Sequence, residues 1–318
     1  MGKDTLAGRV LKGDRRAVAR AITMLENGEA SPDFLDGLGK GLGRAFILGL
    51  TGPPGTGKST LVDRLVAEYR KRKMKVGVIA VDPTSPITGG ALLGDRVRMA
   101  RHTLDSGVFI RSMASRGWSG GLSAAVSEAI QVLDAAGMEV VVIETVGIGQ
   151  SDIEIMKVAH AVVVVTMPGL GDDVQVSKAG LMEIGDVYAV NKSDLPGADA
   201  MVINLLSVVG EMKGRSPPVL KVSALKGEGI DRLFDATEAL RARFLSPEGE
   251  SMRIHSVSGM IMELAKKRLL SEFEGRAMAE STELASRVVG RTITFEKAAG
   301  ILAESQRKYR TAPRLVKR

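Results

Sequence analysis

A glycine-rich segment that directly follows a short apolar run constrains the fold of this chain most strongly. Residues 46–50 are typical of a buried strand, and residues 52–60 match the pattern G-x-x-x-x-G-K-[ST]. Downstream, Leu61, Leu65 and Val66 lie at helical spacing with charged residues between them. A strand, a glycine-rich turn and a helix in this order predict a phosphate-binding loop, and therefore a nucleoside-triphosphate site.

Each residue type in this segment has a physical role in holding phosphate. Glycines let the backbone curl so that its N–H groups converge on phosphate oxygens, and the following helix adds its N-terminal dipole. Lys58 supplies a positive charge for the β- and γ-phosphates, and the Ser59 hydroxyl is placed to ligate Mg²⁺. A chance glycine-rich turn is the alternative, which the flanking strand and helix disfavour. The predicted nucleotide-binding residues here are Gly52, Pro53, Pro54, Gly55, Thr56, Gly57, Lys58, Ser59 and Thr60.

Length and composition limit the class of protein. A chain of 318 residues suffices for one large α/β domain with smaller elements, and 44% hydrophobic residues are ordinary for a globular protein. No cysteine is present, which excludes disulfides and thiolate metal sites. No apolar run approaches the roughly 20 residues that span a bilayer, and the first residues lack a signal-peptide pattern. We therefore expect a cytoplasmic protein with no membrane partner.

The net charge is +7, and the last twelve residues contain basic residues but no acidic one. Such a tail suits nucleic acid or an acidic partner surface. A solvated end is the favoured interpretation, because aromatic residues make up 3% of the chain and only Tyr309 lies in the tail. Nucleic acid is not expected as a partner.

Seven apolar runs alternate with amphipathic helical patterns. The runs cover residues 46–50, 76–81, 108–111, 140–143, 161–166, 187–190 and 219–222. Strands rich in Val, Ile and Leu that are separated by helices predict a mostly parallel sheet covered by helices on both faces, as in α/β P-loop NTPases. Ligands of such sheets bind at the carboxyl ends of the strands, and the motifs described below follow these runs.

Helical extensions are expected on both sides of this sheet. Residues 1–43 are predicted to be an N-terminal helical extension, with Asp14 as the cap of a helix that runs through Leu25. Residues 44–246 are predicted to be the P-loop domain, and residues 246–250 have the composition of a linker. Residues 247–318 are predicted to be a helical segment that serves dimerisation or folds back on the core.

A second motif, Asn191-Lys192-Ser193-Asp194, directly follows the run 187–190 and suits guanine. Asp194 can accept hydrogen bonds from the ring N1–H and the exocyclic amine of guanine, a donor pair that adenine lacks. Asn191 and the stem of Lys192 would hold the base and the edge of the phosphate loop. The segment Ser223-Ala224-Leu225 matches the Ser-Ala element, whose main chain contacts guanine. These segments predict GTP and GDP rather than ATP, and a solvated polar turn is the alternative.

Acidic residues follow two further runs and one glycine-rich segment. Glu144 ends the run 140–143, where an acid can hold the Mg²⁺ shell, and Gly147 can bring a main-chain N–H to the γ-phosphate. Asp82 ends the second run, and Asp95 can approach the γ-phosphate, Mg²⁺ or the attacking water in a switch segment. The alternative for Asp95 is that it caps the following helix. The candidate catalytic residues are Lys58, Asp82, Asp95 and Glu144, and the candidate metal ligands are Ser59, Asp82, Asp95 and Glu144.

In combination, these motifs resemble the MeaB/ArgK/MMAA family of P-loop GTPases, which are chaperones of methylmalonyl-CoA mutase. The resemblance extends from Gly13-Asp14-Arg15-Arg16 to about Leu240. The matching segments are residues 52–60, V-D-P-T-S-P at 81–86, G-D-R-V-R-M at 94–99, E-T-V-G-I-G-Q-S at 144–151, P-G-L-G-D-D-V-Q-V-S-K-A-G at 168–180 and N-K-S-D at 191–194. Val97 stands where many relatives have Thr.

The resemblance implies a Mg²⁺-dependent GTPase that forms a homodimer. It further implies a chaperone for an adenosylcobalamin-dependent acyl-CoA mutase of the methylmalonyl-CoA type. Such a chaperone gates cofactor loading and protects the mutase during turnover. Gln175 and Lys178 match a third switch segment that signals between the two proteins. An ordinary exposed helix start is the alternative for these two residues.

Three other functions compete with this interpretation. Nickel-type metal-insertion GTPases commonly carry Cys-rich or His-rich segments, whereas this chain has no Cys and three scattered His: His102, His160 and His255. An ATPase or kinase linked to cationic amino-acid transport would need adenine selectivity or phosphoryl transfer to protein, and Asp194 argues against the first. A nucleic-acid-associated GTPase would rest on the basic tail alone.

Overall fold

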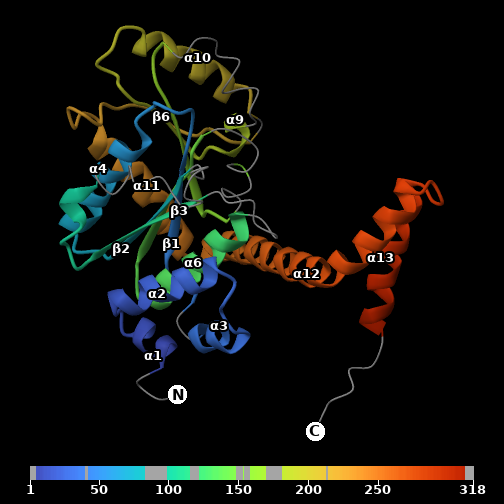
Figure 1. Cartoon of the computed structure of the whole chain (residues 1–318). Coiled ribbons are helices and arrows are strands. Elements are labelled where there is room, and N and C mark those ends of the chain that lie inside the picture. The colour runs from blue at the N-terminus through green and yellow to red at the C-terminus, as the bar shows by residue number, and fades with distance from the viewer. Residues whose placement is uncertain are drawn as a thin grey trace. The chain divides into compact units, whose positions relative to one another are not determined.

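A seven-stranded, all-parallel sheet organises the larger part of the protein (Figure 1). In space the strands follow the order β3-β2-β4-β1-β5-β6-β7. They are β1 (Phe46–Thr51), β2 (Val76–Asp82), β3 (Val108–Ala114), β4 (Val140–Glu144), β5 (Ala161–Thr166), β6 (Val187–Val190) and β7 (Val219–Lys221). Every strand lies on an apolar run identified in the sequence, so the predicted parallel α/β fold is confirmed.

This computed structural model describes residues 5–39, 42–82, 99–114, 122–147, 153, 158–169, 181–212 and 214–311. The described residues fall into two compact units, one within residues 1–117 and 122–261 and one within residues 262–318. Across the described ranges, no helix combines the length and the apolar character needed to cross a membrane. The cytoplasmic location stays a prediction.

Helices cover both faces of the sheet, because each strand offers apolar side chains on both sides. On one face, α4 (Lys58–Lys71) and α11 (Ile230–Leu245) pack in a core that includes Leu48, Val142 and Val163. On the other face, α6 (Leu122–Ala135) packs closely on β2. A Cβ at Gly77 would lie 2.9 Å from the Leu133 side chain. The nucleotide motifs between these helices and strands are therefore held by a sheet that is buried on both faces.

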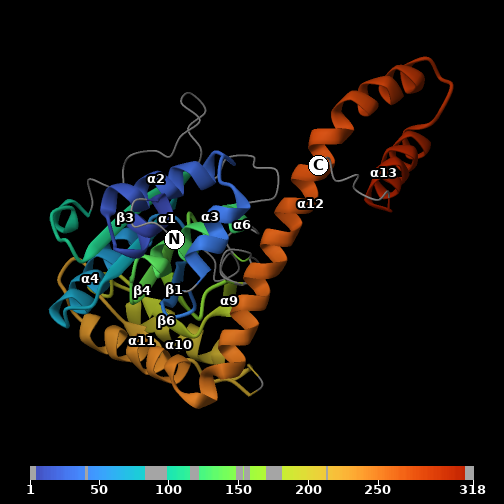
Figure 2. The same ribbon diagram turned by 90° about the horizontal axis from the view of Figure 1, so that it is seen from below.

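The N-terminal helices α1 (Leu6–Leu11), α2 (Arg15–Glu26) and α3 (Pro32–Leu38) belong to the same compact unit as the sheet (Figure 2). Asp14 caps α2 as predicted, since its carboxylate accepts the N–H groups of Arg16 and Ala17. One face of α2 is fully buried and contacts α6. The buried residues of α2 are Ala17, Val18, Ala21, Ile22 and Leu25.

The larger unit also contains η2 (Ala100–His102), α9 (Leu181–Ile184), α10 (Ala198–Gly210) and η3 (Pro247–Gly249). The prediction of a linker at residues 246–250 is wrong. These residues form η3, which packs on α11 with a buried Gly249, and α12 (Glu250–Val289) begins at once. A Cβ at Gly249 would lie 2.3 Å from the Arg243 carbonyl oxygen, so this turn is tightly packed.

The second unit is a helical hairpin made of the later part of α12 and of α13 (Phe295–Thr311). The Ser305 hydroxyl on α13 donates to a Glu280 carboxylate oxygen on α12 at 2.6 Å. Thr294 caps α13 as predicted, because its hydroxyl oxygen accepts the Lys297 N–H at 3.2 Å. The C-terminal helical extension predicted from the sequence is therefore present.

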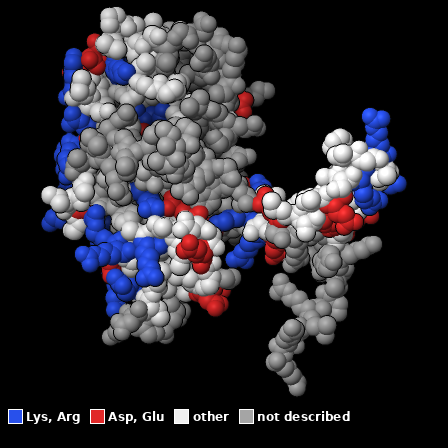
Figure 3. Space-filling model, viewed as in Figure 1, with Lys and Arg blue, Asp and Glu red and all other residues white. Residues whose placement is uncertain are grey.

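Basic side chains are prominent on the surface of the larger unit. Figure 3 shows many Lys and Arg side chains along one side of this unit, with acidic side chains scattered among them. This distribution agrees with the net charge of +7.

Candidate nucleotide site

The loops that carry the predicted site residues meet at the carboxyl edge of the sheet. β1 lies between β4 and β5. The strands β2, β3 and β4 all lie on one side of β1, and β5, β6 and β7 lie on the other side. Such a reversal of strand order forms the ligand crevice of open α/β sheets. The phosphate loop follows β1, Glu144 ends β4, Asn191 follows β6 and Ser223 follows β7. The structure therefore brings these four segments to one crevice.

Glycines allow the phosphate loop to pass between neighbouring strand ends. Gly52 has φ +141°, and a Cβ there would lie 1.9 Å from the carbonyl oxygen of Val165 at the end of β5. Gly147 has φ +90°, and its Cβ would lie 1.8 Å from the Gly52 carbonyl oxygen. A Cβ at Gly57, which has φ +87°, would lie 2.5 Å from the Asn191 amide nitrogen. The backbone contacts of Gly52 and Gly147, and the contact of Gly57 with the Asn191 side chain, leave no room for a Cβ.

Lys58 places its ammonium group inside this loop. It is 6% exposed, and its Nζ donates to the carbonyl oxygens of Gly52 at 2.7 Å, Pro53 at 3.0 Å and Val146 at 3.2 Å. α4 begins at Lys58, and its N-cap residue is Gly57, which has no side chain to cap the first turn. The N–H groups of that turn and the ammonium group therefore form one positive region, which suits a phosphate chain.

Ser59 and Glu144 form the part of the site that fits a metal ion. The Ser59 hydroxyl donates to Glu144 Oε1 at 2.6 Å, and both residues are 6% exposed. Hard oxygen donors of this kind suit Mg²⁺, which is usually held by one or two carboxylates together with substrate phosphates. Glu144 is in register with Ala80 on β2, so Asp82 lies two residues further along the neighbouring strand.

Most of the remaining candidates for the metal and switch sites lie in segments that the structure does not describe. Asp95, Gln175 and Lys178 lie outside the described residues. Among the residues that are described, no cluster of three or more His, Cys, Asp or Glu side chains is placed to hold a metal. The structure therefore joins Ser59 with Glu144 and puts Asp82 at the next strand end. The catalytic and metal roles of these residues stay predictions.

A pocket of about 310 Å³ lies beside the phosphate loop, where the base of a nucleotide is expected. Asn191 connects the two sides of this region, since its Nδ2 donates to the Thr56 carbonyl at 2.7 Å and its Oδ1 accepts the Ala224 N–H at 3.0 Å. The pocket adjoins both α4 and the two predicted base-binding segments. Its lining residues are Gly57, Thr60, Asn191, Lys192, Asp194, Leu195, Ser223, Ala224 and Leu225.

Asp194 is held as an ionised hydrogen-bond acceptor in this pocket. The Ser223 hydroxyl donates to Asp194 Oδ1 at 2.7 Å, and the Lys226 ammonium lies 3.8 Å from Oδ2. The hydrogen bond from Ser223, with a smaller contribution from Lys226, lowers the pKa of Asp194 below its ordinary value. An ionised carboxylate at this position can accept hydrogen bonds from two N–H donors of a base.

One residue that contacts the base segment was not identified from the sequence. Arg64 on α4 donates from Nε to the Ala224 carbonyl at 2.8 Å and from Nη2 to the Leu225 carbonyl at 2.9 Å. In the sequence, Arg64 is one of several charged residues between apolar positions of a helix. No motif marks it, because its partners lie 160 and 161 residues away.

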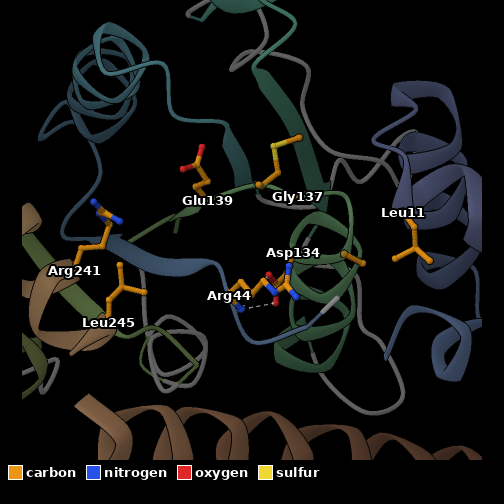
Figure 4. A pocket seen from close by; sticks show the side chains of 9 residues that line it. Leu11, Arg44, Asp134, Gly137, Glu139, Arg241 and Leu245 are labelled. Carbon is orange, nitrogen blue, oxygen red and sulfur yellow. Dashed lines mark hydrogen bonds between the residues drawn. The ribbon is translucent and has the colours of Figure 1, made fainter. Parts of the chain in front are cut away.

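A larger pocket of about 540 Å³ lies at the amino ends of the strands and is shown in Figure 4. Its central feature is Asp134 at the end of α6, which accepts main-chain N–H groups from Gly43, Arg44 and Ala45. Burial raises the pKa of Asp134 despite these hydrogen bonds. The pocket is lined by Leu11, Arg44, Asp134, Ala135, Gly137, Met138, Glu139, Arg241 and Leu245. None of these residues belongs to a predicted nucleotide motif, whereas the smaller pocket beside Gly57 is lined by residues of three such motifs.

Comparison with known proteins identifies the family. A family model described as methylmalonyl-CoA mutase-associated GTPase MeaB matches residues 18–277. A protein of Pyrococcus abyssi that is named as a GTPase is 49% identical over 278 residues, which cover 85% of this chain and 82% of that protein. GTPase ArgK of Escherichia coli is 37% identical over 72% of each chain. The mitochondrial methylmalonic aciduria type A homolog of Mus musculus is 31% identical over 76% of this chain and 64% of its own.

A solved structure agrees with these relatives. The crystal structure of a LAO/AO transport system kinase superposes with a TM-score of 0.68 at 25% identity, over 96% of this chain and 99% of that chain. The predicted family resemblance is thus confirmed by sequence and by fold. The chain therefore belongs to the MeaB family, and it is a P-loop GTP hydrolase.

Proposed function

We propose that this GTPase acts as a chaperone and gate for an adenosylcobalamin-dependent mutase of the methylmalonyl-CoA type, where it serves cofactor loading and protection. The match of residues 18–277 to a family described as mutase-associated is the observation that carries this proposal. The name of the mouse relative, which refers to methylmalonic aciduria, also supports it. The interaction with the mutase would depend on whether GTP or GDP occupies the site.

In the proposed reaction, the phosphate loop and Lys58 hold the triphosphate while water attacks the γ-phosphate. The Lys58 ammonium and the loop N–H groups stabilise charge on the leaving phosphate oxygens. Ser59 and Glu144 would hold Mg²⁺, with Asp82 and Asp95 ordering the surrounding water. When bound there, Mg²⁺ supplies neutralisation of phosphate charge. Gly147 offers its main-chain N–H on the γ-phosphate side of the loop.

Guanine selectivity would come from the pocket beside Gly57. Asp194 accepts the N1–H and 2-amino donors of the base, and the Asn191 side chain joins the base segment to the phosphate loop. The geometry supports this assignment because the Asp194 carboxylate lines a pocket next to the phosphate loop. GTP and GDP are accordingly the proposed ligands.

The proposed active form is a homodimer. Several large apolar side chains on the later part of α12 are exposed in the single chain, including Leu269, Leu270 and Phe273 at 46%, 45% and 37%. Apolar side chains at this spacing on one helix are typical of a surface that pairs with another copy. Gln175 and Lys178 are proposed, from the family resemblance, to belong to the switch segment that the mutase contacts.

The solved relative described as a LAO/AO transport system kinase raises a second candidate, an ATPase or kinase linked to cationic amino-acid transport. The placement of Asp194 disfavours it, because this carboxylate would face the N1 acceptor of adenine rather than a donor. A nickel-type insertion role is also disfavoured, because the chain contains no Cys.

The function is tested by measuring GTP hydrolysis and mutase binding together. We expect slow hydrolysis by the protein alone and at least about tenfold faster hydrolysis with its mutase, since a partner often completes such sites. Lys58→Ala should abolish hydrolysis with and without the mutase. A pull-down of candidate acyl-CoA mutases should show different binding with GTP and with GDP. Equal binding of every candidate in both states would contradict the gating role.

A further inference from the structure

Arg64 clamps the main chain of the base segment from the side of the phosphate helix. Its Nε and Nη2 donate to the consecutive carbonyls of Ala224 and Leu225 at 2.8 and 2.9 Å. A guanidinium group presents these two donors at a fixed spacing on a rigid plane, which a lysine ammonium does not. Arg64 therefore sets the orientation of two successive peptide groups.

This clamp closes a ring of contacts around the base pocket. Ala224 donates its N–H to Asn191 Oδ1, and Asn191 Nδ2 donates to the Thr56 carbonyl of the phosphate loop. Arg64 then connects the same base segment to α4, which begins at Lys58 directly after that loop. Two independent links thus hold the base segment relative to the phosphate loop.

The orientation of the Ala224 carbonyl also determines where the next N–H points. In a trans peptide the C=O and the following N–H point in opposite directions, and the chain has no cis peptide among its described residues. Because the Ala224 carbonyl faces Arg64, the Leu225 N–H points away from the guanidinium group. Within the part of the chain that the structure describes, this N–H has no hydrogen-bond acceptor. Leu225 lines the base pocket.

We propose that Arg64 is a positioning residue for base specificity: it fixes the Leu225 N–H as the donor for the oxygen at position 6 of guanine. A main-chain N–H donates a hydrogen bond to this oxygen, whereas it cannot donate to the 6-amino group of adenine, which is itself a donor. Asp194 accepts hydrogen bonds from the N1–H and the 2-amino group. The Asp194 carboxylate and the Leu225 N–H therefore recognise different atoms of the base. The inference rests on the proposed GTP site.

The test compares nucleoside diphosphates that differ at one position of the base. Dissociation constants are measured with the full chain for GDP, for IDP, which lacks only the 2-amino group, and for 6-thio-GDP, in which a weakly accepting sulfur replaces the oxygen. We expect Arg64→Met to weaken the binding of GDP and of IDP by about tenfold each, which corresponds to the loss of one well-placed hydrogen bond. Binding of 6-thio-GDP should weaken by less than about threefold. Arg64→Lys should behave like Arg64→Met.

Two control variants separate this role from a general effect. Asp194→Asn should weaken binding of GDP more than binding of IDP, and should weaken binding of 6-thio-GDP as much as that of GDP, because Asp194 contacts the N1–H and 2-amino groups and not the atom at position 6. Lys71→Met, on the exposed last turn of the same helix, should change none of the three constants. Melting temperatures of all variants show whether each is folded.

The outcomes are distinguishable. An equal loss of affinity for all three diphosphates in Arg64→Met would show that Arg64 has only a structural role. Unchanged affinity for all three would show that Arg64 does not contribute to the site. Either result would overturn the inference while leaving the GTP site intact. If the unchanged protein binds ADP as tightly as GDP, the proposed GTP site itself fails.

Discussion

At the scale of single residues, close backbone contacts decide how the phosphate loop is seated. Gly52, Val165 and Gly147 bring three main-chain segments within distances that no Cβ would permit. Gly55 also has a positive φ, +80°, but a Cβ there would meet nothing within 4 Å. Gly52 is therefore required because a Cβ would collide with the backbone of β5, whereas Gly55 is favoured by its backbone conformation alone.

This difference predicts unequal effects of alanine. Gly52→Ala should abolish GDP binding and strongly lower the melting temperature, because its Cβ would collide with the backbone of β5. Gly55→Ala should cost only the left-handed backbone strain, about 1 kcal/mol of unfolding free energy. Chemical denaturation and GDP titration of both variants check the prediction. Similar, small effects of the two substitutions would contradict the observed seating of the loop.

At the scale of elements, the N-terminal helices are part of the folded core of the larger unit. The buried face of α2 packs on α6, and α6 in turn packs on β2. Arg15 at the start of α2 also donates to the carbonyls of Asp105 at 2.8 Å and Val108 at 2.6 Å, next to β3. The segment before the phosphate loop therefore supports the sheet from its α6 side.

A core substitution in α2 tests this arrangement. Ile22 is fully buried, so Ile22→Ala should lower the free energy of unfolding by about 3 kcal/mol through lost burial and the resulting cavity. The loss should appear in the main cooperative transition, because α2 belongs to the same unit as the sheet. Arg20→Ala, at an exposed position of the same helix, should change it by less than about 0.5 kcal/mol. A separate early transition in Ile22→Ala, with the main transition unchanged, would show that α2 folds independently.

At the scale of the whole molecule, one histidine couples stability to pH. His160 stacks on Phe244 with ring centroids 3.9 Å apart and accepts the Ile47 N–H at Nδ1, 2.9 Å away. Burial, together with repulsion by Arg253, lowers the pKa of His160 to about 3. Its ordinary pKa is 6.5. Between these two values the unfolded chain binds a proton that the folded protein does not, so stability falls as pH falls.

We therefore expect unfolding free energy to decrease below pH 6.5 by roughly 1 kcal/mol per pH unit from this residue. Several carboxylates titrate in the same range, so the effect is measured as a difference. His160→Asn keeps an acceptor for the Ile47 N–H but has no group that titrates here, and it should lose less stability between pH 7 and pH 5. Urea denaturation at both pH values gives the comparison, and parallel losses in the two proteins would rule out His160 as the coupling group.

Local sequence patterns accounted for much of the fold and the site. The apolar runs predicted all seven strands. The five inner strands are almost entirely apolar because they are buried on both faces, whereas the edge strands β3 and β7 are only partly buried. The phosphate-loop and base motifs were recognisable because the residues that each motif requires lie within a few consecutive positions. These required residues are glycines, a positive charge or a carboxylate. The segment after Ser246 was misjudged as a linker, because its Pro and Gly form a packed turn rather than an open one.

The sequence by itself thus determined the strands, the glycine-rich loop after the first strand and the family, and it predicted Asp194 as the acid that selects guanine. Only the tertiary structure showed the pairing of Ser59 with Glu144, 85 residues apart, and the clamp of Arg64 on Ala224, 160 residues apart. The reason is physical: strand order and helix packing place distant residues next to each other, and no local pattern encodes which ones will meet. An arginine on a helix is recognised as part of a nucleotide site only when the carbonyls that it holds are known.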